Sequence, residues 1–250
     1  MVKSRLWSSD NWWLVRDVAC IIAIMLVATF GVAIAIGWYQ QGAWPGRMSM
    51  KQLGTNGVAL VVTAQNIAFV LFAWWRTRSA QLLGLAPQWR SVLVWSLIGA
   101  PLVLVVNILV GLLFATFGLQ QNQAAAYPLV AGDYQGQLVF WVVASLVAPI
   151  GEEILFRGYL WGAIHRYYGI WWAVIGTALI FAIGHSTSAS QGAVVLVSQT
   201  LVMGVLLAWL RHMSGSVWAG VCAHAMNNSI AVAIVTYCVN HPDIGCARSS

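Results

Sequence analysis

Long apolar runs alternate with short polar stretches along the whole chain, and several of them reach the 18 or more residues that predict a membrane helix. An α-helix needs roughly 20 mostly apolar residues to cross the hydrocarbon core of a bilayer. Helices satisfy their own backbone hydrogen bonds there, which irregular segments facing lipid cannot do. The pattern predicts helices over residues 18–38, 58–75, 91–119, 138–166, 170–185, 193–210 and 217–239. We therefore expect an all-α fold, a polytopic transmembrane helical bundle of about seven, or eight, membrane helices.

The composition agrees with a chain that lies in lipid. Hydrophobic residues make up 60% of the 250 residues, charged residues only 7%, and the mean hydropathy is +0.79. The formal net charge of +6 invites a nucleic-acid interpretation. However, the basic residues are scattered beside the apolar runs, as in proteins whose Lys and Arg residues set the topology at an anionic leaflet. We expect the lipid bilayer as a partner and no nucleic acid.

The distribution of Lys and Arg predicts the orientation of the bundle. With seven spans and the N-terminus inside, nine basic residues fall on the inner side and three on the outer side. The inner set is Lys3, Arg5, Arg16, Arg76, Arg78, Arg90, Arg157, Arg166 and Arg211, and the outer set is Arg47, Lys51 and Arg248. Basic loops stay in the cytoplasm, so we expect an integral protein of the bacterial plasma (inner) membrane with a cytoplasmic N-terminus. The polar stretch 120–137 then forms an outer loop.

Seven polar residues interrupt the C-terminal apolar runs, where lipid makes them costly. They are Glu152, Glu153, Arg157, His185, His224, Asn227 and Asn228. Ionisable side chains inside a membrane are rare and mark functional sites. Counted from the nearest inner-side residue, Glu152 lies 14 residues above Arg166, His185 16 above Gly169 and His224 13 above Arg211. At 1.5 Å per residue these counts give rises of about 20–24 Å, so we expect the three side chains to meet at one level.

Spacing within the helices suggests separate roles for these residues. Glu153 and Arg157 are four residues apart with the acid first, the favourable order for a helical ion pair. Glu152 points about 100° away from Glu153 and is left for chemistry. The alternative is that both acids serve Arg157 in a buried ion cluster. His224 and Asn228 are also four residues apart on one helix face, and each can donate a hydrogen bond.

Two further amides have a structural interpretation. Asn227 lies round the helix from Asn228, so we expect it to bond a neighbouring helix. Asn107, which follows Pro101 in the third apolar run, marks a kink or an interhelical hydrogen bond.

Three motifs in this order resemble those of a known family. Glu152, Glu153 and Arg157 form E-E-x-x-x-R, Phe181 and His185 form F-x-x-x-H, and His224 and Asn228 form H-x-x-x-N. The set resembles the Abi family, also called CPBP, which comprises CAAX proteases and bacteriocin-processing enzymes. The resemblance covers roughly residues 138–235, and no motif residue is missing.

The resemblance implies an intramembrane endopeptidase that hydrolyses a peptide bond of a membrane-associated protein or peptide. The chain then divides into an inner-side N-terminal arm (1–17), N-terminal membrane helices and loops (18–137), a catalytic helical core (138–239) and a C-terminal tail (240–250). Two other classes remain open: a non-catalytic immunity or scaffold protein that uses the same site for binding, and a proton-coupled transporter.

The expected catalytic residues are Glu152, His185, His224 and Asn228, supported by Glu153 and Arg157. Glu152 is the general base on water, and His185 orients that water or shares the proton. His224 and Asn228 donate to the oxyanion of the tetrahedral intermediate. We expect no cofactor. Some members of the family are named metalloproteases, so the alternative is a zinc ion held by Glu152, His185 and His224.

Overall fold

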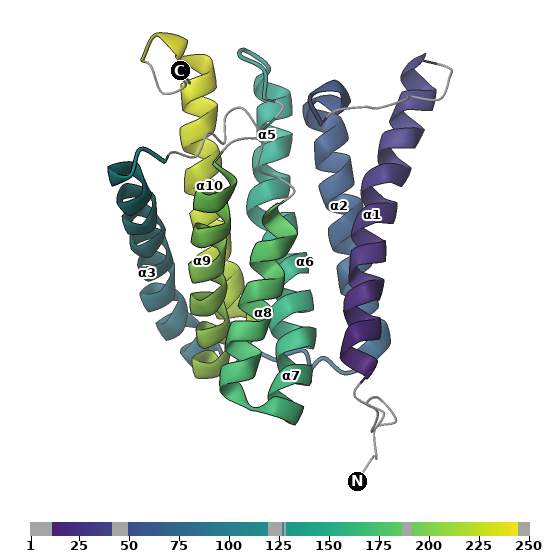
Figure 1. Cartoon of the computed structure of the whole chain (residues 1–250), viewed down its shortest axis with the longest axis vertical. Coiled ribbons are helices and arrows are strands. Elements are labelled where there is room, and N and C mark those ends of the chain that lie inside the picture. Colours follow the sequence, from purple (N-terminus) through teal and green to yellow (C-terminus); the bar gives the residue numbers. More distant parts are fainter. Residues whose placement is uncertain (1–11, 42–49, 120–126, 128, 187–191, 245–250) are drawn as a thin grey trace.

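The computed structural model describes residues 12–41, 50–119, 127, 129–186 and 192–244, and all regular structure within these ranges is helical. Figure 1 shows the helices side by side in one bundle. Each predicted apolar run corresponds to one helical rod, and the run 91–119 alone extends past its helix, by three residues. Six rods carry one helix label each: α1 (Trp12–Gln41), α2 (Met50–Thr77), which is kinked at Gly54, α3 (Trp89–Thr116), α8 (Ile170–His185), α9 (Ala193–Ser214) and α10 (Val217–Asn240). The predicted polytopic helical bundle is thereby confirmed.

Six of the described rods are long and apolar enough to cross a membrane. The shorter one is α8, whose 16 residues from Ile170 to His185 are also apolar. At 1.5 Å per residue, α8 spans about 24 Å, so His185 at its C-terminal end stands well above the turn at Gly169.

The fourth rod runs without a break from Tyr134 to Tyr168 but contains two wide turns. Its parts are α5 (Tyr134–Val142), the π-helix η1 (Val143–Val147), α6 (Ala148–Glu153), the π-helix η2 (Ile154–Leu160) and α7 (Trp161–Tyr168). A π turn inside an α-helix inserts one residue and frees a backbone carbonyl. Pro149 lies at the start of α6, directly after the first wide turn. The two adjacent glutamates therefore lie between two π turns.

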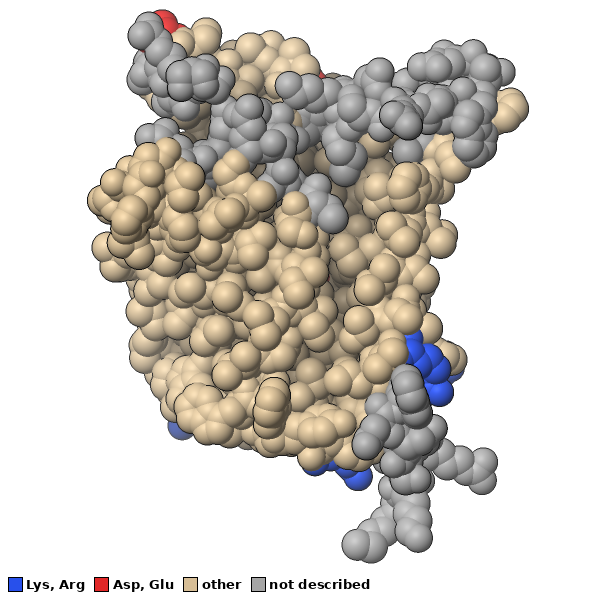
Figure 2. Space-filling view, viewed as in Figure 1, with Lys and Arg blue, Asp and Glu red and all other residues tan. Residues whose placement is uncertain are grey.

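Basic side chains gather at one end of the bundle. Figure 1 places the start of α1 and the turn between α7 and α8 at this end, and the end of α10 at the opposite end. Figure 2 shows blue basic side chains at the end where α1 starts, and the described ones there are arginines. Of the described Lys and Arg residues, Lys51 alone lies at the opposite end. Lys3, Arg5, Arg47 and Arg248 lie outside the described residues, as do residues 1–11 of the predicted arm and 245–250 of the predicted tail.

The last residues of the predicted arm already belong to α1. Asp17 is buried at 2% exposure. It accepts hydrogen bonds from Arg76 Nε and Nη2, at 3.0 and 2.8 Å, and from the hydroxyl of Tyr159. The charges therefore stabilise one another, and they join α1 and α2 to the fourth rod.

A tight loop between α2 and α3 fixes the start of α10. Gly84 has φ +69°, and a Cβ there would lie 2.6 Å from the Arg211 guanidinium. Its carbonyl accepts hydrogen bonds from Val217 N at 3.1 Å and Ser216 Oγ at 3.0 Å. A side chain at this position would separate the loop from α9 and α10. The loop thus helps to set the level of α10, which carries His224.

Candidate active site

A buried ion cluster joins the fourth rod to α10. Glu153 Oε1 accepts from Arg157 Nη1 at 2.8 Å, and both side chains are 0% exposed. The same oxygen lies 3.1 Å from Nδ1 of His224, which is 1% exposed. The predicted pair of Glu153 and Arg157 is therefore present, and the carboxylate has a second partner that spacing alone did not predict.

Close helix contacts make room for this cluster. A Cβ on Gly220 would lie 2.7 Å from Oε2 of Glu153, so only glycine lets α10 approach the carboxylate this closely. On the other side, Arg157 Nη2 donates to the Gly204 carbonyl at 3.2 Å. The guanidinium also lies 4.5 Å from the centre of the Phe181 ring, a cation–π contact. The Arg157 guanidinium therefore interacts with a carboxylate, a backbone carbonyl and an aromatic ring within the bundle.

His224 is oriented by Glu153 toward Glu152. An ionised carboxylate can only accept a hydrogen bond, so Nδ1 of His224 is the donor to Glu153. In the neutral imidazole, Nε2 then carries no hydrogen and can accept one. Nε2 lies 3.8 Å from Oε2 of Glu152. Glu152 retains 13% side-chain exposure, in contrast to fully buried Glu153. The two acids thus occupy different environments, as the 100° separation on the helix predicts.

The residue count that placed His224 level with Glu152 was wrong, although the two side chains meet. That count starts at Arg211 and crosses the turn at Gly215 and Ser216, where the chain reverses direction. His224 lies near the start of α10, which begins at Val217.

His185 lies on the other side of Phe181. Its Nδ1 lies 2.9 Å from the Phe181 carbonyl, and its ring centre is 4.4 Å from the Phe181 ring. The His224 ring meets the same phenyl ring edge-on, at 5.8 Å. One aromatic side chain therefore fixes both imidazoles, and His185 keeps Nε2 available for a ligand.

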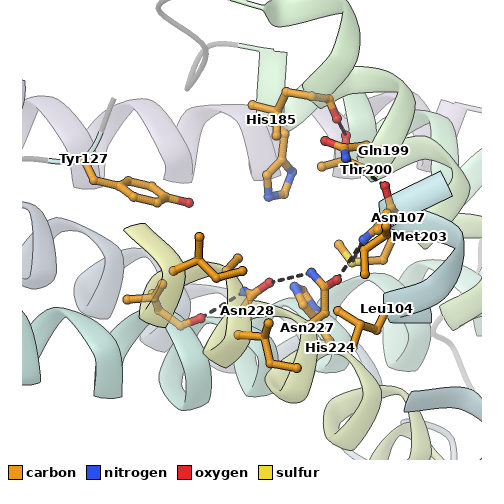
Figure 3. A pocket seen from close by; sticks show the side chains of 17 residues that line it. Leu104, Asn107, Tyr127, His185, Gln199, Thr200, Met203, His224, Asn227 and Asn228 are labelled. Carbon is orange, nitrogen blue, oxygen red and sulfur yellow. Dashed lines mark hydrogen bonds between the residues drawn. The ribbon is translucent and has the colours of Figure 1, made fainter. Parts of the chain in front are cut away.

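A cavity of about 260 Å³ opens next to these imidazoles. It lies among α3, η1, α8, α9 and α10, and His185, His224 and Asn228 all contribute to its wall. Figure 3 shows His185 pointing into the cavity toward the side formed by Asn227 and Asn228. Glu152 is not a wall residue and reaches the cavity through its contact with His224.

Tyr127 contributes a phenol to the cavity from the predicted outer loop. Figure 3 shows its ring pointing inward. Burial, and secondly the charge of Glu152, raise the pKa of Tyr127. The phenol therefore stays protonated at neutral pH and can donate a hydrogen bond into the cavity.

Three asparagine side chains, Asn107, Asn227 and Asn228, form a hydrogen-bonded chain along one wall, and the Gln199 amide joins it at the backbone of Asn107 (Figure 3). Gln199 Nε2 donates to the Asn107 carbonyl at 3.0 Å, and Asn107 Nδ2 donates to Asn227 Oδ1 at 2.9 Å. Asn227 Nδ2 then donates to Asn228 Oδ1 at 3.4 Å, and Asn228 Nδ2 donates to the Ala144 carbonyl at 3.0 Å. The interhelical bond expected for Asn107 and Asn227 is thus made between these two residues.

This chain fixes the orientation of the Asn228 amide. Ala144 lies in the π turn η1, where the wide turn leaves carbonyls to be satisfied by other donors. One hydrogen of Asn228 Nδ2 is used in this bond, and the other has no partner among the described residues. The amide can therefore donate to a ligand in the cavity while its plane is held at both ends.

The residues of the zinc alternative do not gather as metal ligands. Within the described ranges, no three His, Cys, Asp or Glu side chains are close enough together to hold a metal ion. Glu152 and His224 face one another, with 3.8 Å between Oε2 and Nε2, whereas His185 lies on the other side of the Phe181 ring. We therefore derive no step through zinc. The preference for a reaction without metal stays a prediction.

Comparison with known proteins confirms the resemblance that the motifs suggested. Residues 134–230 match the family model described as type II CAAX prenyl endopeptidase Rce1-like. The chain is also 24% identical to the protein named "Putative membrane peptidase YdiL" from Bacillus subtilis (strain 168), over 92% of this chain and 89% of that protein. No solved structure matches. The family match begins at the start of α5 and covers every residue of the three motifs.

Proposed function

We propose that this chain is an intramembrane peptidase that hydrolyses a peptide bond of a membrane-associated protein or peptide with water activated by Glu152. The match to CAAX prenyl endopeptidases and the likeness to a protein named as a membrane peptidase support the reaction class. The observation that carries the mechanism is the arrangement of Glu153, His224 and Glu152. A fully buried acid orients an imidazole whose free nitrogen faces a second, less buried acid.

The net charge of the buried ion cluster favours uptake of the proton that water loses. When both acids are ionised, Glu152, Glu153 and Arg157 carry one net negative charge. An apolar environment disfavours an unbalanced charge, so one additional proton on Glu152 or His224 stabilises the group. Glu152 removes a proton from water as the oxygen attacks the carbonyl carbon. His224, which we expected to donate to the oxyanion, instead faces Glu152 through Nε2 and can share that proton.

The amide chain supplies a hydrogen-bond donor for the negative charge that develops on the carbonyl oxygen. When water adds to the carbonyl carbon, the carbonyl oxygen becomes an oxyanion. Asn228 Nδ2 has a hydrogen available, and the amide is held by Asn227 and Ala144, so little reorganisation is needed. Nε2 of His185 reaches the same cavity from α8 and orients the attacking water. The C–N bond then breaks, and the amine leaves with the proton taken from water.

The direct test compares the membrane proteins of cells that carry the wild-type chain with those that carry Glu152→Gln. This substitution keeps the volume of the side chain and removes its basicity. We expect an uncut protein or peptide to accumulate in the variant, and newly generated N-termini to disappear. Identical sets of N-termini in both cells, with the two chains present at equal levels, would contradict the proposal.

The same variant separates peptidase from the two other classes. If the site only binds a partner, Glu152→Gln complements a strain that lacks the wild-type chain. If the chain is a proton-coupled transporter, purified protein in liposomes carries a proton flux that Glu152→Gln abolishes. A peptidase fails to complement as Glu152→Gln and shows no such flux.

A further inference from the structure

We infer that the site receives its substrate from the outer side of the membrane, as an apolar polypeptide segment at the outer surface or in the outer leaflet. This inference rests on the proposed peptidase function and names the substrate class of the same site. It follows from three features of the described residues: the level of the cavity in the bundle, the closed layer beneath it, and the distribution of charge between the two ends.

The cavity lies in the half of the bundle away from the end where α1 starts. On α9 its wall residues, from Leu196 to Met203, all lie in the half nearer Ala193. On α3 they run from Leu104 to Ile108, beyond the middle of a helix that starts at Trp89 at the basic end. Tyr127, which closes one side, comes from the connection between α3 and α5 at the opposite end.

Beneath the cavity the bundle is closed. Its lowest wall residue on α10 is His224, and next to His224 lie Glu153 and Arg157, both fully buried. Phe181 and Leu207 are also 0% exposed and belong to the same core. A polypeptide that came from the basic end would have to break the ion cluster and this packed layer to reach Glu152.

The charge distribution assigns the basic end to the cytoplasm. Arg16, Arg78, Arg90 and Arg166 are exposed at that end, and basic residues are retained on the cytoplasmic side during insertion. At the other end the described charged side chains include two exposed acids, Asp133 and Asp243. The cavity therefore belongs to the outer half of the membrane.

The wall shows which kind of segment enters. Leu104, Leu196 and Ile230 make one part apolar, and the amide chain supplies hydrogen bonds for a peptide backbone. Ile108 and Ile234 are wall residues, yet they are 52% and 58% exposed on the outside of the bundle. The cavity thus reaches the surface that faces lipid, so an apolar segment can enter sideways from the outer leaflet.

Side-selective labelling of the cavity tests this inference without any substrate. In a variant whose four cysteines are replaced, Ala231→Cys places one thiol in the cavity wall. Spheroplasts and inverted vesicles are treated with a small, charged, membrane-impermeant methanethiosulfonate. Ser79→Cys and Val130→Cys report the two ends of the bundle, and Ala233→Cys reports the lipid-facing side of α10. Thr200→Cys, at another position in the same wall, repeats the measurement if Ala231→Cys does not fold.

We expect the reagent to modify positions 231 and 130 in spheroplasts and position 79 only in inverted vesicles, while position 233 stays unmodified in both. Modification of position 231 from the inverted-vesicle side alone overturns the inference. Failure of both cavity thiols to react from either side, in folded protein, also overturns it because the cavity would then have no aqueous access.

The substrate class is tested by mapping the N-termini that Glu152→Gln removes. We expect these cuts to lie in polypeptide segments at the outer face of the membrane or in the outer leaflet. Cuts in cytoplasmic segments contradict the inference while supporting the peptidase function. If no N-termini differ, the proposed function fails, and the labelling result still decides which side the cavity faces.

Discussion

Replacing Glu153 by Gln isolates the contribution of the buried ion cluster. The substitution keeps the size of the side chain and removes one charge. Arg157, 0% exposed and bonded to Glu153 at 2.8 Å, then loses its carboxylate partner. The Gln side chain can still accept from His224 through its amide oxygen. The main consequence is therefore an unpaired guanidinium within the bundle.

The size of the effect follows from the burial of both groups. Removing one partner of a buried ion pair costs about 3–5 kcal/mol because the other charge stays desolvated. For a chain of this length, each kcal/mol shifts the unfolding temperature by about 2–4 °C, so we expect a decrease on the order of 10 °C. Glu152→Gln should lower the unfolding temperature less than Glu153→Gln does, because it leaves Arg157 paired with Glu153.

Thermal unfolding of purified protein in detergent measures the difference between the two variants. The double variant Glu153→Gln/Arg157→Met is the matched control. It removes both charges, and replacing a buried pair by groups of similar volume is often neutral. We expect it to recover most of the lost unfolding temperature. If Glu153→Gln unfolds with wild-type behaviour, or if the double variant is no better than the single one, the cluster does not stabilise the fold as argued.

Three further predictions follow from the site. Asn228→Ala should lower kcat by about 10²–10³ with KM nearly unchanged, the usual loss of one oxyanion donor, whereas Asn227→Ala should lower kcat by less than about tenfold; equal losses would show that the wrong amide has been assigned. Gly220→Ala should lower both unfolding temperature and activity because the new Cβ would lie 2.7 Å from Glu153 Oε2, while Gly31→Ala, with no atom within 4 Å of its Cβ position, should change neither. Purified enzyme should retain activity after exhaustive treatment with o-phenanthroline and contain substoichiometric zinc by elemental analysis; loss of activity that stoichiometric zinc restores would make the three ligands of the zinc alternative the correct assignment.

The helices could be predicted because each depends on a local property. Apolar length alone selects a membrane helix, so the seven runs agree with the seven rods to within a few residues at most ends. The pairing of Glu153 with Arg157 is equally local, since residues four apart share a helix face. The bond between Asn107 and Asn227 was predicted only in part: each amide was expected to bond another helix, and the structure shows that they bond each other.

Features that depend on contact between distant segments were not predicted. The bond of Glu153 to His224 requires α6 and α10 to touch, which Gly220 permits but no spacing reveals. Tyr127 enters the cavity from a stretch that its polarity marked only as a loop. Asp17 was assigned to the arm because its partners, Arg76 and Tyr159, are distant in sequence. The π turns have no periodic pattern of apolar residues by which they could be predicted. Pro149, directly after the first one, indicates an irregularity in the helix at that place.

The two adjacent glutamates have requirements that one carboxylate cannot meet. An acid that holds Arg157 and His224 must stay ionised, since its protonation would leave a buried guanidinium unbalanced. A general base must instead gain and lose a proton in every turnover. Neighbouring positions on a helix point about 100° apart, so Glu153 faces the closed layer while Glu152 faces Nε2 of His224 beside the cavity. Exchanging the roles would place the proton acceptor where water has no access, which is why Glu152 is the base in the proposed reaction.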